Sequence, residues 1–239
     1  MSPEPGAGPS LWVGRSGISP TEVKLSGAPA IVNKIVNNVA NKPETCLFHD
    51  ELPAGAVREA GMSFVPRRVV TATDSHGRSY FLLDGPAGNV SEQPGRGLTF
   101  HELWITDGPL ASNEGTADAA AVPVEHHTPL GGSRIRIVEF LPDHQHVSGE
   151  AAADFAAIGA DDRVIGDADD GRHRNDTVDY NIILSGEIYA CTDAGELLLR
   201  PGDVLIQRGT KHTWHNRGDV PCIFASIMIS AEPLRVQSA

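Results

Sequence analysis

Aromatic residues and cysteines are both scarce in this sequence of 239 residues, and each scarcity narrows the class of protein. Phe, Trp and Tyr make up 5% of the chain and hydrophobic residues 40%, so a packed interior would be mainly aliphatic. The three cysteines, Cys46, Cys191 and Cys222, are odd in number and far apart. They predict buried thiols in a reducing compartment and exclude a disulfide framework.

Basic residues are also in the minority, because 19 Lys and Arg stand against 31 Asp and Glu and give a net charge of −12 at pH 7. This charge argues against nucleic acid or an anionic membrane as a partner. No apolar run reaches the length that spans a bilayer. Residues 1–10 lack a basic region followed by an apolar core, so no secretion signal is expected. Together these features predict a cytoplasmic protein.

Short apolar segments separated by Gly, Pro and Asp dominate the last third of the chain. Turns are expected at Ser185-Gly186 and Pro201-Gly202, with a strand on each side. Short strands at this spacing predict an antiparallel sandwich or barrel. The expected strands cover residues 180–184, 187–191, 197–199, 204–206 and 222–229.

Further strands are expected upstream of this region. Residues 66–84 have the pattern of a hairpin, and residues 98–106 that of a single strand. Residues 107–133 are acidic and rich in Ala and Gly, which is typical of a long loop. The alternating segment 133–140 predicts a half-buried strand that opens the barrel. No internal repeat is evident, so the earlier strands are interpreted as extra layers on one barrel.

These patterns predict a domain organisation. Residues 1–20 are rich in Pro, Gly and Ser and are expected to be disordered. Residues 21–61 form an extension with apolar residues at helical spacing between 31 and 39, which could be a helix or a dimerisation arm. Residues 62–235 form one all-β domain, in which 133–230 are the barrel core and 143–171 an insertion.

The insertion interrupts the strand pattern with a short predicted helix. Residues 150–160 place Ala152, Phe155 and Ile158 three residues apart, and Gly159 lies near the end. The insertion directly precedes the segment that carries the candidate ligands. We therefore expect it to lie at the mouth of the barrel, where it could act as a lid.

Polar residues with ligand chemistry lie at the edges of the last strands. His173 and Asp179 come just before or at the start of one strand, and His212 follows another. In a small barrel, residues of the same parity on neighbouring strands point into one lumen. Two imidazoles and one carboxylate that converge there would form a facial site for a divalent metal, with positions open to substrate.

This spacing resembles the two motifs of the cupin superfamily, G-x5-H-x-H-x3-4-E-x6-G and G-x5-P-x-G-x2-H-x3-N. The chain departs from the motifs in having Asn175 for the second His, Asp179 for Glu and Gln207 for Pro, with one residue fewer between Gly and Pro. The resemblance covers roughly the last hundred residues. The matching positions are His173, Asn175, Asp179 and Gly186 in the first motif and Gly202, Gly209, His212 and Asn216 in the second.

The resemblance implies a cupin double-stranded β-helix, or jelly-roll barrel, with extra N-terminal strands and a short helical insertion. It implies a divalent metal, whether Zn, Mn, Fe or Ni, held by His173, Asp179 and His212 with Asn175 in the remaining position. The first three would also be the catalytic residues. Four further residues are expected to line the substrate pocket: Tyr180, Trp214, Asp176 and Asn216.

Other histidines have weaker patterns. His144 and His146, with Glu150, match the first motif by spacing, but the residues that follow are Ala-rich and helical. They are interpreted as loop or pocket-rim residues. His101 and the pair His126-His127 are interpreted as surface or sheet residues.

Three functions stay open at this point. The first is a metal-dependent, non-redox lyase, dehydratase, isomerase or cyclase that acts on an apolar, oxygenated small molecule. The second is an Fe(II)-dependent dioxygenase that uses the same His, Asp and His residues. The third is a non-catalytic binding or sensor module. A homodimer paired through sheet edges is expected in each case.

Overall fold

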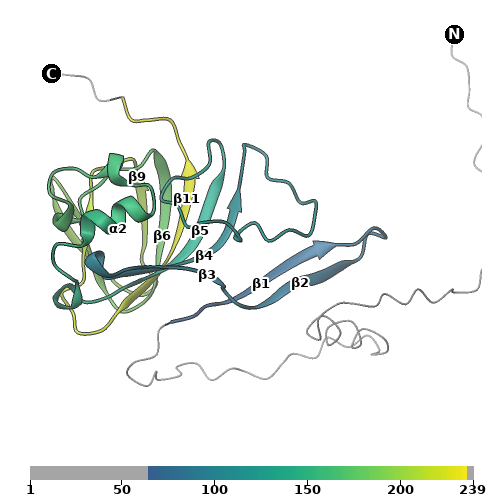
Figure 1. Ribbon diagram of the computed structural model, residues 1–239, viewed down its shortest axis with the longest axis horizontal. Helices are drawn as coiled ribbons and strands as arrows, with labels where there is room; N and C mark the ends of the chain where they lie inside the picture. Colours follow the sequence, from purple (N-terminus) through teal and green to yellow (C-terminus); the bar gives the residue numbers. More distant parts are fainter. Residues whose placement is uncertain (1–63, 236–239) are drawn as a thin grey trace, which may run out of the picture. The chain divides into compact units, whose positions relative to one another are not determined.

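The computed structural model of the protein describes residues 64–235 (Figure 1). The expectations for residues 1–20 and 21–61, and for Cys46, lie outside this part. Strands form most of the regular structure, and the one α-helix of the described residues is α2 (Ala151–Ala157). The assignment of 62–235 to a single domain stays a prediction.

The larger sheet has six antiparallel strands in the order β3-β4-β5-β11-β6-β9. Side chains alternate between its two faces: in β6, Asp179 and Asn181 are buried whereas Tyr180 between them is 38% exposed. The strands are β3 (Asn89–Gln93), β4 (Leu98–Thr106), β5 (Ser133–Phe140), β6 (Thr177–Ser185), β9 (Val204–Arg208) and β11 (Cys222–Ser230).

A smaller sheet of three strands lies across from it, in the order β10-β7-β8. Its strands are β7 (Ile188–Thr192), β8 (Gly195–Leu199) and β10 (Thr213–His215). Two isolated bridges continue the pairing, from Val164 to His173 and from His173 to His212. Gly186 turns the chain from β6 into β7 at φ +70°, and a Cβ there would lie 2.4 Å from the carbonyl oxygen of Pro221. The turn therefore requires glycine.

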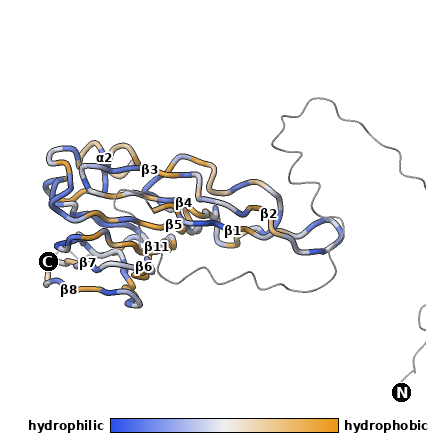
Figure 2. Tube along the Cα trace, turned by 90° about the horizontal axis from the view of Figure 1, so that it is seen from below, coloured by the Kyte–Doolittle hydropathy of each residue, from blue (hydrophilic) through white to orange (hydrophobic). Residues whose placement is uncertain are grey.

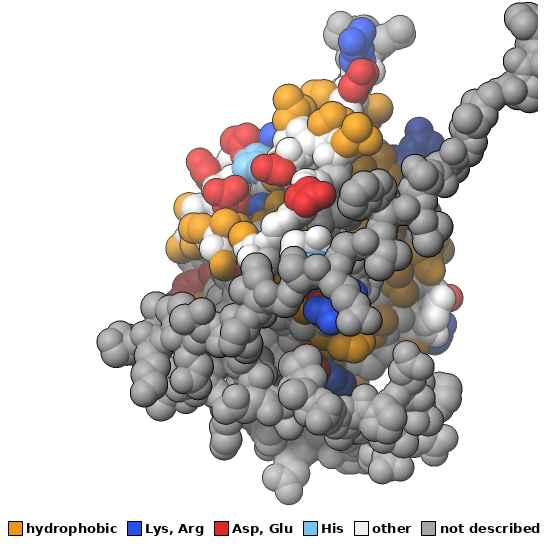
Figure 3. Space-filling view, turned by 90° about the vertical axis from the view of Figure 1, so that its right-hand side faces the viewer, with side chains coloured by type: hydrophobic (Ala, Val, Ile, Leu, Met, Phe, Trp, Pro, Cys, Tyr) orange, Lys and Arg blue, Asp and Glu red, His pale blue; other side chains and the backbone are white. Residues whose placement is uncertain are grey.

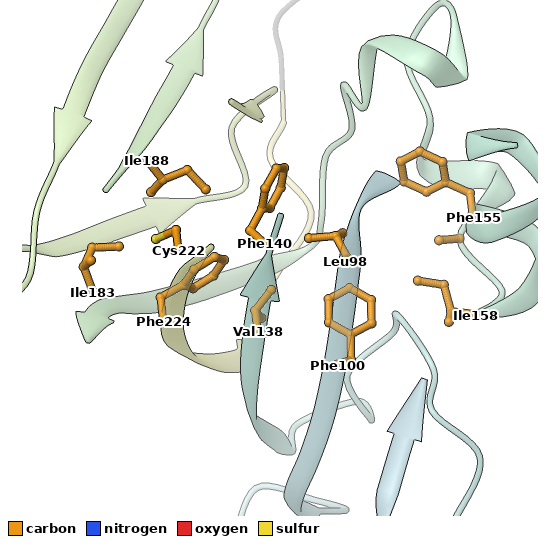
Figure 4. Close-up of a cluster of buried hydrophobic side chains, with 11 residues drawn as sticks. Leu98, Phe100, Val138, Phe140, Phe155, Ile158, Ile183, Ile188, Cys222 and Phe224 are labelled. Atoms are coloured by element: carbon orange, nitrogen blue, oxygen red, sulfur yellow. The ribbon is translucent and has the colours of Figure 1, made fainter. Parts of the chain in front are cut away.

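The core is shared by both sheets and the helix. Figure 4 shows Ile183 from β6 and Ile188 from β7 on the same side as Phe224 from β11, while Phe155 from α2 faces the strand that carries Leu98. All of these side chains are at least 95% buried. Two antiparallel sheets closed around one core form the jelly-roll barrel that the sequence predicts.

The inserted helix forms one wall of this barrel. Ala151, Phe155 and Ile158 are at most 1% exposed, so the buried stripe begins at Ala151 rather than at Ala152, which is exposed. The helix ends before Gly159, which adopts the left-handed conformation at φ +65°. The guanidinium carbon of Arg96 lies 3.9 Å from the centre of the Phe155 ring. Movement of this segment as a lid stays a prediction.

A hairpin of β1 (Arg67–Thr73) and β2 (Ser79–Pro86) forms a separate two-stranded sheet, which extends away from the barrel strands in Figures 1 and 2. Arg68 ties it to the long loop after β4, because its guanidinium donates two hydrogen bonds to Asp118, at 2.8 and 2.5 Å. Phe81 in β2 is 73% exposed.

The observed strands confirm most of the predicted ones, and β5 and β4 begin and end where the sequence predicts. One expectation is wrong: the barrel does not begin at residue 133, because β3 and β4 hydrogen-bond into the same large sheet. Strands β3 and β10 were not predicted. Both are short and carry polar residues, so neither shows the apolar pattern of a strand.

On the face shown in Figure 3, acidic side chains gather around a histidine and basic side chains are scattered. The visible part of this face carries no continuous basic patch, which agrees with the net charge of −12. Among the described residues, no helix has the length and apolar character needed to cross a membrane.

Candidate active site in the barrel

A cavity of about 70 Å³ lies between the two sheets, and we call it the lumen. Five of the residues singled out in the sequence line it: His173, Asn175, Asp179, His212 and Trp214. All but Trp214 are at least 92% buried. The lumen is thus the place where the structure brings the motif residues together, and apolar side chains of β4, β5 and β11 also line it.

Backbone pairing sets the position of the two motif histidines. His173 and His212 exchange two N–H···O hydrogen bonds of 3.0 Å, which makes them directly opposed residues of an antiparallel pair. Side chains of such a pair project to the same face of the sheet. The two rings consequently lie side by side, with their centres 4.2 Å apart.

A second set of hydrogen bonds fixes which ring nitrogen carries the proton. Nδ1 of His173 lies 2.9 Å from the carbonyl oxygen of Gly171, and Nδ1 of His212 lies 2.9 Å from that of Thr210. A carbonyl only accepts, so each Nδ1 donates its hydrogen and each Nε2 keeps a lone pair. Burial lowers the pKa of His212 to about 4 and the pKa of His173 well below its ordinary value. Both rings are therefore neutral at pH 7.

The carboxylate of Asp179 lies next to them but is held by an intervening amide. Nε2 of Gln207 lies 3.3 Å from Oδ2 of Asp179 and 2.9 Å from Nε2 of His212, so it donates one hydrogen to each. Oδ1 of Asp179 is buried without a hydrogen-bond partner among the described residues. Burial raises the pKa of Asp179 to about 6, although the nearby Thr177 hydroxyl, the charge of Arg136 and the Gln207 amide oppose the rise.

A third imidazole enters the lumen from the long loop between β4 and β5. His126 is 6% exposed, which corrects its interpretation as a surface or sheet residue. Its Nε2 donates to Oδ1 of Asn175 over 2.5 Å, and its Nδ1 is buried without a partner among the described residues. Asn175 is shorter than the histidine usual at this motif position, and the His126 ring lies against its amide. The loop that carries His126 has no periodic pattern, so nothing in the sequence directs the residue inward.

Two arginines complete the lumen and were also missed. Arg136 in β5 is 2% exposed and shares the Glu102 carboxylate with Arg134, at 2.9 and 2.7 Å respectively. Arg96, in the short 3-10 turn before β4, is 9% exposed. Alternating Arg134 and Arg136 resemble the solvent face of a strand. Glu102 is the partner that buries them, and β-sheet register places it directly opposite Arg136.

Three residues expected in the pocket do not line the lumen. Tyr180 points outward because strand alternation puts it on the opposite face from Asp179. Asp176 forms an ion pair with Arg163 at 2.7 Å, away from the lumen. Asn216 is 1% exposed, and its amide donates to the carbonyl oxygens of Phe140 and Val220 at 3.1 and 2.9 Å. Its role is to close the loop after β10.

The fit of a divalent metal can be tested on the donor atoms. The Nε2 lone pairs of His173 and His212 face the same buried cavity, which suits a cation, although the Gln207 amide donates to the one on His212 and would have to be displaced. The backbone carbonyls hold both rings in the tautomer that metal binding needs. Yet no group of three or more His, Cys, Asp or Glu in the described part of the chain converges on one point. The residues thus fit a cation on His173 and His212, and Asp179 does not join them while Gln207 holds it.

Comparison with known proteins agrees with the fold and the motif. The profile of the Cupin domain family matches residues 164–229. Phomopsin biosynthesis cluster protein C' of Diaporthe leptostromiformis is 30% identical over 158 residues, which cover 64% of this chain and 71% of that protein. The cupin-domain-containing oxidoreductase fogC of Aspergillus ruber is 25% identical over 163 residues, or 66% of each chain.

Among solved structures, a putative ethanolamine utilization protein of Salmonella typhimurium is similar over 71% of this chain and 100% of its own, with a TM-score of 0.35 and 9% identity. The sheet order, the paired imidazoles and the family match define a jelly-roll barrel whose motif residues face its lumen. The chain belongs to the cupin superfamily.

Proposed function

We propose that the protein is a small-molecule enzyme that moves protons on an oxygenated substrate inside the lumen, without net oxidation. The observation that carries this proposal is the pairing of two kinds of group in one buried cavity. Burial raises the pKa of Asp179 to about 6, and the neutral imidazole of His173 lines the same cavity with a lone pair on Nε2. A carboxyl group whose pKa lies near the working pH is suited to both accept and return a proton.

The roles follow from which atoms donate and which accept. Asp179 in its ionised form takes a proton from a carbon or oxygen next to a carbonyl group, and in its protonated form returns it. Nε2 of His173 accepts a hydrogen bond from a substrate hydroxyl, because its Nδ1 is committed to Gly171. Gln207 holds Oδ2 of Asp179, so that the unpartnered Oδ1 is the oxygen available for proton transfer. The apolar wall excludes water from the reacting atoms.

A divalent cation is an alternative use of the same lone pairs: it would be held by Nε2 of His173 in place of the substrate hydroxyl and, after displacement of the Gln207 amide, by Nε2 of His212. When bound, it supplies polarisation of a carbonyl or enolate oxygen, which makes the neighbouring proton easier to remove. The donor set does not distinguish Zn, Mn, Fe and Ni, and Asn175 and Asp179 are the further ligands that the family motif offers. A proton transfer of this kind can begin a lyase, dehydratase, isomerase or cyclase reaction.

Proton transfer can be tested before the natural substrate is known. The full-length protein is incubated in D2O with small 1,3-diketones and 2-oxo acids, and loss of the α C–H signal is followed by NMR. We expect the wild type to accelerate exchange of at least one probe, and Asp179→Asn to reduce the acceleration about 100-fold or more. Asp176→Asn is the matched control, because Asp176 lies outside the lumen and should leave the rate unchanged.

Exchange at the buffer rate with every probe would contradict the proposal and favour a binding or sensor module. Equal exchange rates for the wild type and Asp179→Asn would show that Asp179 is not the group that transfers the proton.

An oxidoreductase is the second candidate, and the names of relatives favour it. Besides fogC, a relative in Hypocrea virens that is 35% identical over 66 residues is named a cupin-domain-containing oxidoreductase. The same imidazoles and carboxylate suit Fe(II) and O2. Oxygen uptake by the Fe(II)-loaded protein in the presence of the same probes separates the two candidates. Oxygen uptake that is lost when His173 or His212 is substituted would favour the oxidoreductase over the proton-transfer enzyme.

A further inference from the structure

Arg96 is the one cation lining the lumen for which the described residues provide no ion pair. The residue is 9% exposed, and Nη1 of its guanidinium is buried without a hydrogen-bond partner among the described residues. A buried guanidinium without a counter-charge is costly to the fold. A residue retained at such a cost is a candidate for binding a ligand.

The contacts of Arg96 with Phe155 and Asp154 leave most of the N–H groups of its guanidinium without a partner in the described part of the chain. The guanidinium stacks on Phe155 at 3.9 Å, which satisfies one face of its plane but none of its N–H groups. The charge of Asp154 favours the charged guanidinium, but the Asp154 carboxylate accepts the backbone N–H of Arg96, at 2.9 Å, and makes no ion pair or hydrogen bond with the guanidinium. The N–H groups along the edge of the guanidinium, which are the groups that bind anions, therefore remain available to a ligand.

Charge in the lumen points the same way. The charged residues that line it are Arg96, Arg136 and Asp179, and the carboxylates of Asp154 and Glu102 lie beside the two arginines without lining the lumen. Arg136 is already paired with Glu102, whereas Arg96 is not. The charge of Arg96 also contributes to the lowered pKa of His126, His173 and His212, so its field reaches all three imidazoles. An anion in the lumen would therefore lie within the field of Arg96.

Arg96 also lies at the boundary between the lumen and a second, outer pocket of about 320 Å³. Arg96, Phe140 and Trp214 line both cavities. The outer pocket carries the carboxylates of Asp143, Asp169 and Asp170, which would repel an anion. The anion site is therefore on the lumen side of Arg96, across from the apolar residues of β4 and β5.

We propose that Arg96 binds the carboxylate of the substrate, and that the substrate is a compact acid whose remaining part is apolar. This inference rests on the proposed function, because it concerns the molecule on which the lumen acts. A planar guanidinium matches a carboxylate by two parallel N–H···O hydrogen bonds. The lumen of about 70 Å³ is well below the usual volume of ligand sites, so the acid has few heavy atoms.

The test measures binding alone, so that it is independent of turnover. Propionate and its neutral analogue propionamide are titrated into the full-length protein, and the indole N–H signal of Trp214 is followed by NMR. We expect saturable shifts with propionate and none with propionamide. Arg96→Met should raise the Kd for propionate at least tenfold, and Arg96→Lys should raise it less. Arg200→Met is the control, because Arg200 is exposed and outside the lumen.

The free energy of unfolding of the Arg96→Met variant is measured as well, to show whether a loss of binding comes from a loss of folded protein. Met retains the contact with Phe155 and removes a buried unpaired charge, so the variant should be at least as stable as the wild type. A large loss of stability would show that Arg96 is a structural residue and would overturn the inference.

Three binding results would also overturn it. Equal Kd values for the wild type and Arg96→Met would exclude Arg96, and equal binding of propionamide would exclude an anionic substrate. Both results would leave the proton-transfer role of Asp179 intact. If neither probe perturbs Trp214, the lumen does not take up small acids or their amides. That result would count against the proposed function as well.

Discussion

The lumen has two walls of different construction. One, the sheet wall, consists of paired backbone: β6 and β9 of the six-stranded sheet present Asp179 and Gln207, and the bridge that extends the smaller sheet presents His173 and His212. The other consists of the loop that carries His126, the turn that carries Arg96 and the helix that carries Phe155. The sheet wall holds the motif residues. The irregular wall supplies a third imidazole, an unpaired cation and the aromatic ring on which it stacks.

This difference indicates which lumen residues can change without disturbing the fold. Backbone hydrogen bonds fix the side chains of the sheet wall, as the His173–His212 pair shows. His126 and Arg96 lie outside the paired strands, although the backbone N–H of His126 donates to the carbonyl oxygen of Ile158 at 2.8 Å, so these side chains can be exchanged without changing the strand register. We therefore expect the sheet wall to determine the type of reaction and the irregular wall to determine the substrate.

The largest effect is expected where the irregular wall meets the core. Phe155→Ala would leave a cavity beside Arg96 and His173, because Phe155 is fully buried. Substitutions of this kind cost about 3–5 kcal/mol in the free energy of unfolding. Denaturant titration measures the loss, and Phe81→Ala is the control, since Phe81 is 73% exposed. A loss below 1 kcal/mol would mean that the helix is not part of the folded wall.

Acidification should destabilise the protein through the imidazoles of both walls. The unfolded chain protonates its histidines near pH 6.5, whereas His212 stays neutral down to a pKa of about 4, so protons bind the unfolded state more tightly. Between pH 7.5 and pH 5 this costs about 2 kcal/mol from His212 alone. His173 and His126, with pKa values well below the ordinary value, add to the loss.

Asp179 acts in the opposite direction and provides the control for the pH experiment. Its pKa of about 6 means that the folded protein holds this proton at a pH where an unfolded carboxyl group is ionised. Protonation of Asp179 therefore offsets about 1 kcal/mol of the loss at pH 5. Asp179→Asn should remove the offset and steepen the decline, as measured by denaturant midpoints across the pH range. A shallower decline would mean that burial does not raise this pKa.

A smaller effect is expected at Gln207 on the sheet wall. Its amide occupies Nε2 of His212 and Oδ2 of Asp179, so a cation must displace two hydrogen bonds to use these atoms. Gln207→Leu should raise the affinity for Zn²⁺ about tenfold, since each hydrogen bond contributes about 1 kcal/mol. Competition with a chromophoric chelator measures the affinity, and the exposed Gln145→Leu is the control. A lower affinity would identify Gln207 as a ligand itself.

The two walls also differ in how far the sequence predicts them. Alternation and turn residues predict β4, β5, β6 and β11, and the motif spacing selects His173, Asp179 and His212, all of which line the lumen. Such patterns depend on neighbouring residues along the chain. Tyr180 was expected in the pocket, but it lies on the outer face of β6 because it alternates with the buried Asp179 and Asn181. Trp214 lines the lumen, as expected.

Residues of the irregular wall give no such pattern. His126 enters the lumen through its hydrogen bond to Asn175, a residue 49 positions away. Arg96 is buried because it stacks on Phe155, which belongs to a separate insertion. Each position depends on packing between segments that are distant in sequence, so the sequence alone offers no local signal for either.

The central claim is that the lone pairs of His173 and His212 face one buried cavity. Long-range ¹H–¹⁵N NMR of the imidazoles tests it most directly, with each signal assigned by its absence in His173→Asn or His212→Asn. We expect both rings to carry their proton on Nδ1 at pH 7, and one equivalent of Zn²⁺ to shift both Nε2 signals together. A proton on Nε2 of either ring, or a shift of only one ring, would contradict it.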